Sequence, residues 1–132
     1  MADPILIWGA GAIGGTIGAY WARAGENVLM VDIIADHAER CSTDGLAITG
    51  PVEEFRQVVK TVTPDALSGT FERIVLAVKA HHTEEAATNL RPHLADDGFV
   101  LSAQREQAPP GVTVRPLNQP FFQSYFLLRL AL

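Results

Sequence analysis

The first 32 residues place a glycine-rich turn between two short apolar segments, and this arrangement limits the folds open to the chain more than any other feature. The segment Pro4–Trp8 (PILIW) is continuously apolar, which is typical of a parallel strand buried on both faces. The turn Gly9–Gly15 (GAGAIGG) follows, and a helix is expected over Gly14–Ala24. A second apolar strand, Asn27–Val31 (NVLMV), ends at Asp32. This order of strand, turn, helix and strand predicts a βαβ unit that binds a dinucleotide.

Three glycines of the turn are spaced as G-x-G-x-x-G, and each has a separate physical task. Gly9 permits the tight turn, and Gly11 lets the backbone approach a pyrophosphate where a Cβ would intrude. Gly14 lets the helix pack closely on the strand, and the helix N-terminus offers N–H groups to the phosphates. The alternative is a glycine turn that binds nothing. We expect a pyrophosphate to be bound by the whole turn, which comprises Gly9, Ala10, Gly11, Ala12, Ile13 and Gly14.

Asp32 lies at the end of the second strand, 18 residues after Gly14. A carboxylate at this place can accept hydrogen bonds from both ribose hydroxyls of an adenosine, and it would repel a 2′-phosphate. The cofactor is therefore expected to be NAD or NADP, with NAD favoured by Asp32. The alternative for Asp32 is a solvated acid at a strand end. Arg40 lies further on, where it could meet a 2′-phosphate, but a surface position on a helix is the preferred interpretation.

Strand and helix patterns alternate over the next 70 residues, which favours a parallel sheet with helices on both faces. The right-handed crossover rule then favours an α/β, doubly wound parallel sheet of Rossmann type with about five strands. The expected elements are a helix over Asp36–Thr43, a hairpin from Leu46–Ile48 and Glu54–Val62 that runs into the third strand, a short helix from Thr63 to Gly69, a fourth strand over Arg73–Val78, a helix from Thr83 to about Leu94, a turn at Asp97-Gly98 and a fifth strand over Phe99–Ala103.

The composition excludes several classes of function. The chain has 132 residues, enough for one domain, and its net charge of −5 with no basic cluster makes nucleic acid and anionic membranes unexpected partners. No apolar run reaches the roughly 18 residues of a membrane span. Cys41 is the only cysteine, so no internal disulfide can form, and a cytoplasmic location is expected. The adjacent pair His81-His82 lacks further ligands, so no metal site is expected.

The regular pattern ends after Gln104. Residues 105–119 carry three prolines and no clear periodicity, and residues 120–132 (PFFQSYFLLRLAL) are very apolar. The chain is therefore expected to divide into a dinucleotide-binding Rossmann domain over residues 1–104 and an atypical, irregular C-terminal tail over residues 105–132. Exposed apolar surface on such a tail could cover the sheet or promote self-association.

Three segments together resemble the ketopantoate reductase (2-dehydropantoate 2-reductase) family: GAGAIGG at Gly9–Gly15, IVLAVK at Ile74–Lys79 followed by Ala80, and VLSAQ at Val100–Gln104. The resemblance implies hydride transfer from a nicotinamide cofactor to a 2-keto acid such as 2-dehydropantoate. It also places Lys79 beside the cofactor and Lys79 with Gln104 at the substrate cleft. Lys79 follows a central strand, where open α/β sheets bind ligands, and its charge could attract an anionic keto acid or a phosphate.

The sequence departs from this family in three places. Family members that use NADPH usually carry a basic residue where this chain has Asp32, and Arg105-Glu106 replace the expected Asn-Gly after Gln104. The helical C-terminal half, which carries the family's catalytic lysine, is missing, so the catalytic residues stay unassigned. A truncation or frameshift would explain the change at Gln104, and a genuine alternative C-terminus would explain it equally.

Three functions therefore stay open. The first is an NAD(P)-dependent oxidoreductase of ketopantoate reductase type in a truncated form, which is not expected to turn over keto acids alone. The second is a non-catalytic nucleotide-binding module. The third is a Rossmann protein of another class, such as one that binds a nucleotide-sugar or an adenylate. Asp32 and Lys79 together favour the first two.

Overall fold

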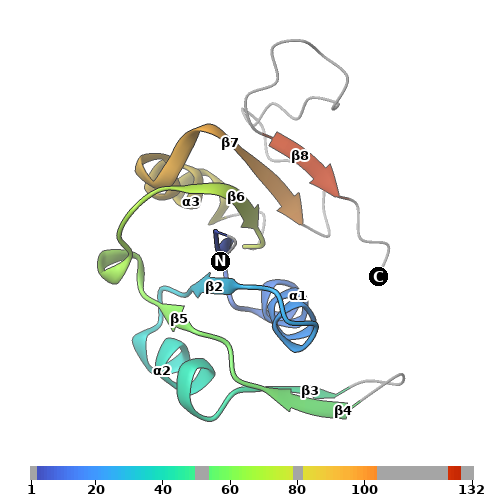
Figure 1. The fold of residues 1–132 in the computed structure, drawn as a ribbon. Coiled ribbons are helices and arrows are strands. Elements are labelled where there is room, and N and C mark those ends of the chain that lie inside the picture. Colours follow the sequence, from blue (N-terminus) through green and yellow to red (C-terminus); the bar gives the residue numbers. More distant parts are fainter. Residues whose placement is uncertain (1–2, 50–53, 79–81, 104–124, 129–132) are drawn as a thin grey trace.

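A six-stranded parallel sheet forms the centre of the molecule (Figure 1). The computed structural model describes residues 3–49, 54–78, 82–103 and 125–128. The strands lie side by side in the order β5-β2-β1-β6-β7-β8. Their bounds are Thr61–Val62 for β5, Val28–Val31 for β2, Ile5–Trp8 for β1, Phe71–Leu76 for β6, Leu94–Ala103 for β7 and Tyr125–Leu128 for β8. If the six strands of this sheet are numbered in chain order, without the two strands of the separate hairpin, their order is that of a Rossmann fold, as the sequence predicts.

The strand β1 lies at the centre of the sheet and is buried along its whole length. Ile5 pairs with Val28 of β2 on one side, and Leu6 pairs with Ile74 of β6 on the other. Because side chains alternate along a strand, Ile5 and Ile7 enter one apolar core while Leu6 and Trp8 enter a second. This confirms the prediction of a strand buried on both faces.

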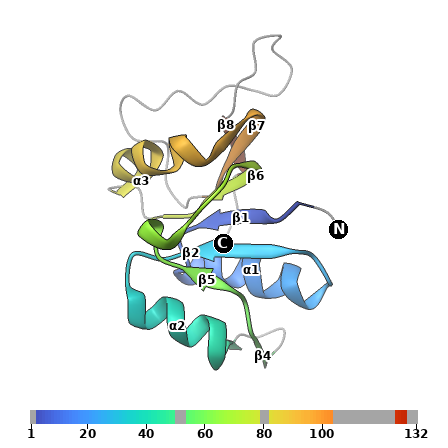
Figure 2. The ribbon, with the colours of Figure 1, turned by 60° about the vertical axis from the view of Figure 1, so that its left-hand side comes forward.

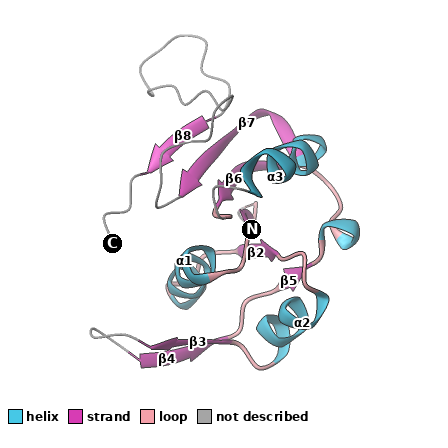
Figure 3. Cartoon of the chain, turned by 180° about the vertical axis from the view of Figure 1, so that it is seen from behind, coloured by secondary structure: helices cyan, strands magenta, loops and turns pink. Residues whose placement is uncertain are grey.

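The helices cover opposite faces of the sheet (Figures 1, 2 and 3). Helices α1 (Ala12–Arg23) and α2 (Ala35–Thr43) pack on the face of Ile5 and Ile7, where Ile17 of α1 and Cys41 of α2 join that core. Helix α3 (Thr83–Leu90) packs on the face of Leu6 and Trp8 through Ala86 and Leu90. The sheet is therefore doubly wound, as predicted.

A small antiparallel hairpin stands apart from the main sheet. It consists of β3 (Leu46–Thr49) and β4 (Glu54–Gln57) and packs beside α1. The ring of Phe55 meets Tyr20 edge-on at 5.0 Å between centroids, and the Arg23 guanidinium lies 4.1 Å from the Phe55 ring centre. The predicted hairpin is thus confirmed, and the predicted segment Glu54–Val62 divides into β4 and the separate strand β5.

Several element boundaries differ from the prediction. Helix α1 begins at Ala12, so Gly14 lies inside its first turn rather than at its start. Helix α3 ends at Leu90 instead of Leu94, and Pro92, which has no N–H to donate to a helix, lies in the turn that follows. Residues Arg91–His93 form a 3-10 turn, and Pro64–Ala66 form another where a short helix was expected.

The predicted turn at Asp97-Gly98 is wrong, because both residues lie within β7. The pairing with β6 shifts at this place: Phe71 pairs with Leu94, but Arg73 already pairs with Phe99. The extra residues of β7 are accommodated as a bulge-like irregularity rather than as a loop between elements. The fourth predicted strand, Arg73–Val78, is observed as β6, whose bounds are shifted by two residues toward the N-terminus.

Strand β8 adds a sixth strand to the five that the sequence predicts. It pairs in parallel with the end of β7, with Val100 opposite Tyr125 and Ala103 opposite Leu128. It comes from the segment after Gln104 for which no regular structure was expected. The apolar sequence of this segment is compatible with pairing at a sheet edge.

Candidate functional site

The carboxyl ends of three neighbouring strands meet at one edge of the sheet. The Gly9 N–H donates to the Val31 carbonyl at 2.9 Å, and the Ala77 N–H donates to the Trp8 carbonyl at 2.9 Å. These bonds align the ends of β1, β2 and β6. The chain leaves β1 toward β2 on one side and later returns to β6 on the other, so the strand order reverses here. Open α/β sheets bind ligands at such a switch point.

Two of the three motif glycines are required by packing within the protein. Gly9 has φ +109°, in the region that favours glycine, and a Cβ there would lie 2.9 Å from the Ala77 carbonyl oxygen. Gly14 is buried, and a Cβ on it would overlap the carbonyl oxygen of Gly9. Sequence reasoning expected Gly14 to let the helix pack closely on the strand. In the structure, the close approach at Gly14 is between α1 and the Gly9 carbonyl of the turn.

Gly11 differs from both neighbours in the motif. Its φ of −76° and ψ of −158° are open to any residue, and a Cβ on it would meet no atom of the described residues within 4 Å. Gly11 is exposed, and neither backbone conformation nor internal packing requires a glycine there. Among the three motif glycines, only Gly11 therefore has free space at the place where a side chain would lie.

Helix α1 begins directly behind this space. Gly11 is its N-cap, no side chain of the described residues caps it, and its first turn holds no acidic residue. The first N–H groups of a helix have no partner within the helix and carry a partial positive charge. Of the intervening turn residues, Ala12 is exposed, whereas Ala10 is buried and Ile13 packs against the core. The buried Ala10 can therefore reach a ligand only through its backbone, whereas the half-buried Ile13 keeps part of its side chain at the surface.

Asp32 stands at the end of β2, next to the turn, and both of its carboxylate oxygens have protein partners. Oδ1 accepts a hydrogen bond from the Ile34 N–H at 2.8 Å, and Oδ2 lies 2.6 Å from His37 Nδ1. The Asp32 side chain is 11% exposed and that of His37 is 39% exposed. Asp32 is thus held in place by the start of α2 rather than freely solvated.

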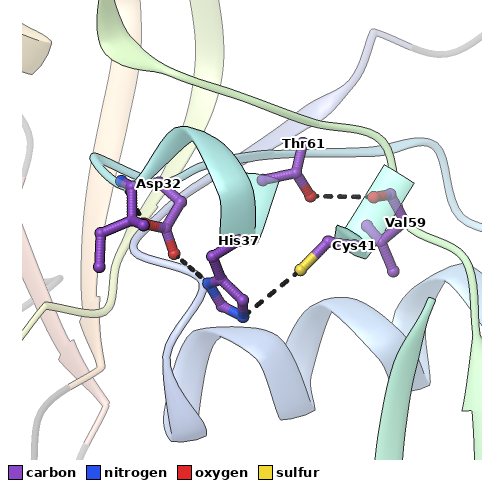
Figure 4. A network of polar contacts seen from close by, with 6 residues as sticks. Asp32, His37, Cys41, Val59 and Thr61 are labelled. Atoms are coloured by element: carbon purple, nitrogen blue, oxygen red, sulfur yellow. Dashed lines mark hydrogen bonds and ion pairs between the residues drawn. The ribbon is translucent and has the colours of Figure 1, made fainter. Parts of the chain in front are cut away.

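The contacts continue from His37 into the core (Figure 4). His37 Nε2 lies 3.6 Å from the Sγ of Cys41, one helical turn further along α2. Burial raises the pKa of the Cys41 thiol above its usual value, and the charge of Asp32 adds to this rise, while a contact with the Thr61 hydroxyl acts in the opposite direction. Thr61 itself donates to the Val59 carbonyl at 2.9 Å.

Sequence reasoning did not assign His37 to the site and missed its contact with Asp32. The available signal was the spacing, since His37 and Cys41 are four residues apart and share one face of a helix that begins just after Asp32. The predicted site residues Lys79 and Gln104 lie outside the described residues. Arg40 is exposed on α2, as expected. Within the described ranges, no helix is long and apolar enough to cross a bilayer.

Comparison with known proteins identifies similar sequences and folds. The family model described as ketopantoate reductase PanE/ApbA matches residues 5–105. A 2-dehydropantoate 2-reductase from Mesorhizobium japonicum is 34% identical over 100 residues, covering 76% of this chain and 31% of the relative. A PanE/ApbA family ketopantoate reductase structure from Ralstonia eutropha is 31% identical with a TM-score of 0.67, covering 77% of this chain and 34% of that one.

A more distant solved structure is described as a complex with a bound cofactor. The ternary structure of D-mandelate dehydrogenase with NADH and anilino(oxo)acetate is 25% identical, with a TM-score of 0.69, and the match covers 77% of this chain and 33% of that one. The chain spans about a third of the length of the curated relatives that it matches. The family match over residues 5–105 therefore spans the glycine turn, the flanking helices and the strands of the sheet up to β7.

Proposed function

Because this chain belongs to the ketopantoate reductase PanE/ApbA family, we propose that it binds a nicotinamide dinucleotide and serves hydride transfer to a small 2-keto acid. The pyrophosphate of the dinucleotide occupies the space in front of Gly11. The adenosine ribose lies at Asp32, and NAD is favoured over NADP. The relative that is described with bound NADH supports this proposal.

The observation that carries the proposal is the difference between Gly11 and its two motif neighbours. Gly9 and Gly14 are explained by the internal packing of the turn, but no described residue needs the space that Gly11 leaves open. That space faces the uncapped start of a twelve-residue helix, whose N–H groups and partial positive charge suit an anion. A pyrophosphate is such an anion, and a side chain on Gly11 would intrude into the space through which it approaches the backbone.

The preference for NAD rests on the charge of Asp32. A carboxylate has about four lone-pair directions, and the contacts with Ile34 and His37 use two of them, so acceptors remain for a ribose diol. Two like unit charges about 4 Å apart repel by about 1 kcal/mol in bulk water and about 4 kcal/mol near a protein surface. Since 1.4 kcal/mol is about a tenfold difference, even a repulsion toward the lower of these two values would favour NADH over NADPH by about tenfold.

The surface beside Asp32 suits an adenine ring. Ile33 and Ile34 follow the carboxylate and are exposed to 72% and 60%, although both side chains are large and apolar. An adenine base placed over them would remove part of that apolar surface from water.

We assign the anionic substrate to the side of the site where β6 and β7 end. Lys79 comes three residues after β6 and Gln104 directly after β7. When bound, the reduced nicotinamide supplies the hydride for the keto carbon of the substrate. In this proposal Lys79 attracts the substrate carboxylate and Gln104 offers a hydrogen bond to it. Replacing Lys79 by Met should weaken keto-acid binding about tenfold or more, because it removes one charge-assisted hydrogen bond.

The test of the proposal is a titration of the full chain with NADH, followed by energy transfer from Trp8 and Trp21 to the reduced nicotinamide. We expect saturable binding that NAD displaces. A panel of 2-keto acids is then added to the complex, and their effect on NADH affinity is measured. Binding of an adenylate or a nucleotide-sugar without any binding of NADH or NADPH would contradict the proposal and favour a Rossmann protein of another class.

A further inference from the structure

We propose that His37 is a specificity-determining residue, which sets how strongly the site distinguishes NADH from NADPH by controlling the position and the charge of the Asp32 carboxylate. This inference rests on the proposed binding of a nicotinamide dinucleotide. It concerns a residue of α2 that neither the motif nor the comparisons assign to the site.

The geometry shows how His37 controls the position of Asp32. Oδ2 lies 2.6 Å from His37 Nδ1, while Oδ1 accepts the Ile34 N–H at 2.8 Å. With one oxygen held by the backbone and the other by the imidazole, the plane of the carboxylate is fixed. Its remaining lone pairs then have defined directions, which is what recognition of two adjacent ribose hydroxyls requires.

The same contact controls the charge that a ribose 2′-substituent would meet. A neutral imidazole donates its Nδ1–H and leaves the pair with the full negative charge of Asp32. An imidazolium still donates from Nδ1, but it cancels that charge. Histidine is the side chain that ordinarily changes charge between about pH 5 and about pH 8. The His37 side chain is 39% exposed, so protons from the solvent can reach the ring.

Cys41 lies on the buried side of the Asp32–His37 pair and adds no charge to it. Its Sγ lies 3.6 Å from His37 Nε2, and the residue is 1% exposed. Because burial raises the pKa of the thiol, Cys41 stays protonated and neutral between about pH 5 and about pH 8. An S–H group can donate to Nε2 of the neutral ring, and in that tautomer the Nδ1–H faces Asp32.

Other charged groups near the pair are at the surface. On α2 these are Asp36, Glu39 and Arg40, and before β5 it is Lys60, all of them exposed. Helix α1 carries no charged residue before Arg23 in its last position. The contact from β5 comes from the uncharged Thr61, which packs near Cys41. Screening by water and salt weakens the exposed charges more than it weakens the pair Asp32–His37.

The experiment measures the ratio of the NADPH and NADH dissociation constants in the full chain near pH 8 and near pH 5.5. The key variant is His37→Asn, whose amide can donate to Asp32 but cannot take up a proton. Asp32→Asn is the matched control without the charge. NADPH also titrates through its own 2′-phosphate, whose second pKa is about 6, and His37→Asn, which has no imidazole to protonate, measures that contribution alone.

The wild-type ratio should fall between the two pH values by at least about fivefold more than the ratio of His37→Asn, because only the wild type can cancel the charge of Asp32. Circular dichroism and thermal unfolding should be similar in the two chains, which shows that the variant is folded. An NMR measurement of the imidazole nitrogens without cofactor should show Nδ1–H as the neutral tautomer in the wild type, and this preference should be lost in Asp32→Asn.

Two results would overturn the inference in distinguishable ways. If the wild type binds neither NADH nor NADPH, the proposed function fails and the inference fails with it. If NADH binds but the ratio shifts equally in the wild type and in His37→Asn, the proposed function stands and the role of His37 is wrong.

Discussion

The two ends of the proposed cofactor site are built in opposite ways. At the glycine turn, the site consists of space from which side chains are absent, and Gly9 and Gly14 leave no room for even one added carbon. At the end of β2, the site consists of side chains that hold one another, namely Asp32, His37 and Cys41. Substitutions at the glycine turn should therefore cause large losses of stability or cofactor affinity. Substitutions at the end of β2 should change cofactor specificity in smaller steps, because the charges and hydrogen bonds there can be altered one at a time.

The largest effect on stability is expected from Gly14→Ala. The new Cβ would overlap the Gly9 carbonyl oxygen, which is backbone and cannot move aside as a side chain can. Overpacking of this kind costs about 3 kcal/mol, at the upper end of the usual range. Chemical denaturation should show this loss. Gly11→Ala is the matched control in the same turn and should lose less than about 1 kcal/mol. Equal losses in the two variants would contradict the packing explanation.

At the other end of the site, Asp32→Asn should change specificity and leave the fold intact. Removing the charge while keeping the shape should reduce the preference for NADH over NADPH about tenfold. Titration of both cofactors near pH 8 measures this ratio. Replacement of the exposed acid Asp36 by Asn serves as the control, because it removes one charge from the same helix region without touching the pair. A similar change in both variants would mean that overall charge, rather than Asp32, sets the preference.

The smallest effect is expected from Cys41. Because its pKa is raised in the folded chain, the folded state holds its proton more tightly than the unfolded state does. The resulting stability is complete below the unfolded value of about 8.5 and is lost as the pH rises through the folded value. The thermal unfolding temperature should therefore fall more steeply above about pH 8.5 in the wild type than in Cys41→Ala. Parallel curves for the two chains would show that Cys41 does not titrate differently on folding.

The sequence predicted the first half of the fold well because its pattern is local. The apolar segment before Gly9, the turn itself and the strand ending at Asp32 follow from burial on both faces and from glycine geometry. The start of α1 was placed two residues late, since a helix can begin within a glycine motif without a capping side chain. The order of the five predicted strands followed from the handedness of their connections.

The features that could not be predicted depend on contacts distant in sequence. The shift in pairing between β6 and β7 turned an expected turn at Asp97-Gly98 into part of a strand. The partner of His37 depends on how α2 docks against the end of β2, which no propensity encodes. A histidine on an amphipathic helix has the same pattern whether it faces water or a carboxylate.

The central claim is that the space at Gly11 exists for a dinucleotide, and the affinity of Gly11→Val for NADH tests it most directly. The backbone at Gly11 accepts any residue, so the variant should keep its circular dichroism and its unfolding transition. Thr16→Val places the same side chain at an exposed position one turn further along α1 and should bind NADH as the wild type does. We expect Gly11→Val to lose NADH affinity by about a hundredfold or more, because it separates the phosphates from charge-assisted hydrogen bonds worth about 1.5–3 kcal/mol each. Undiminished NADH affinity in a folded Gly11→Val chain would contradict the claim.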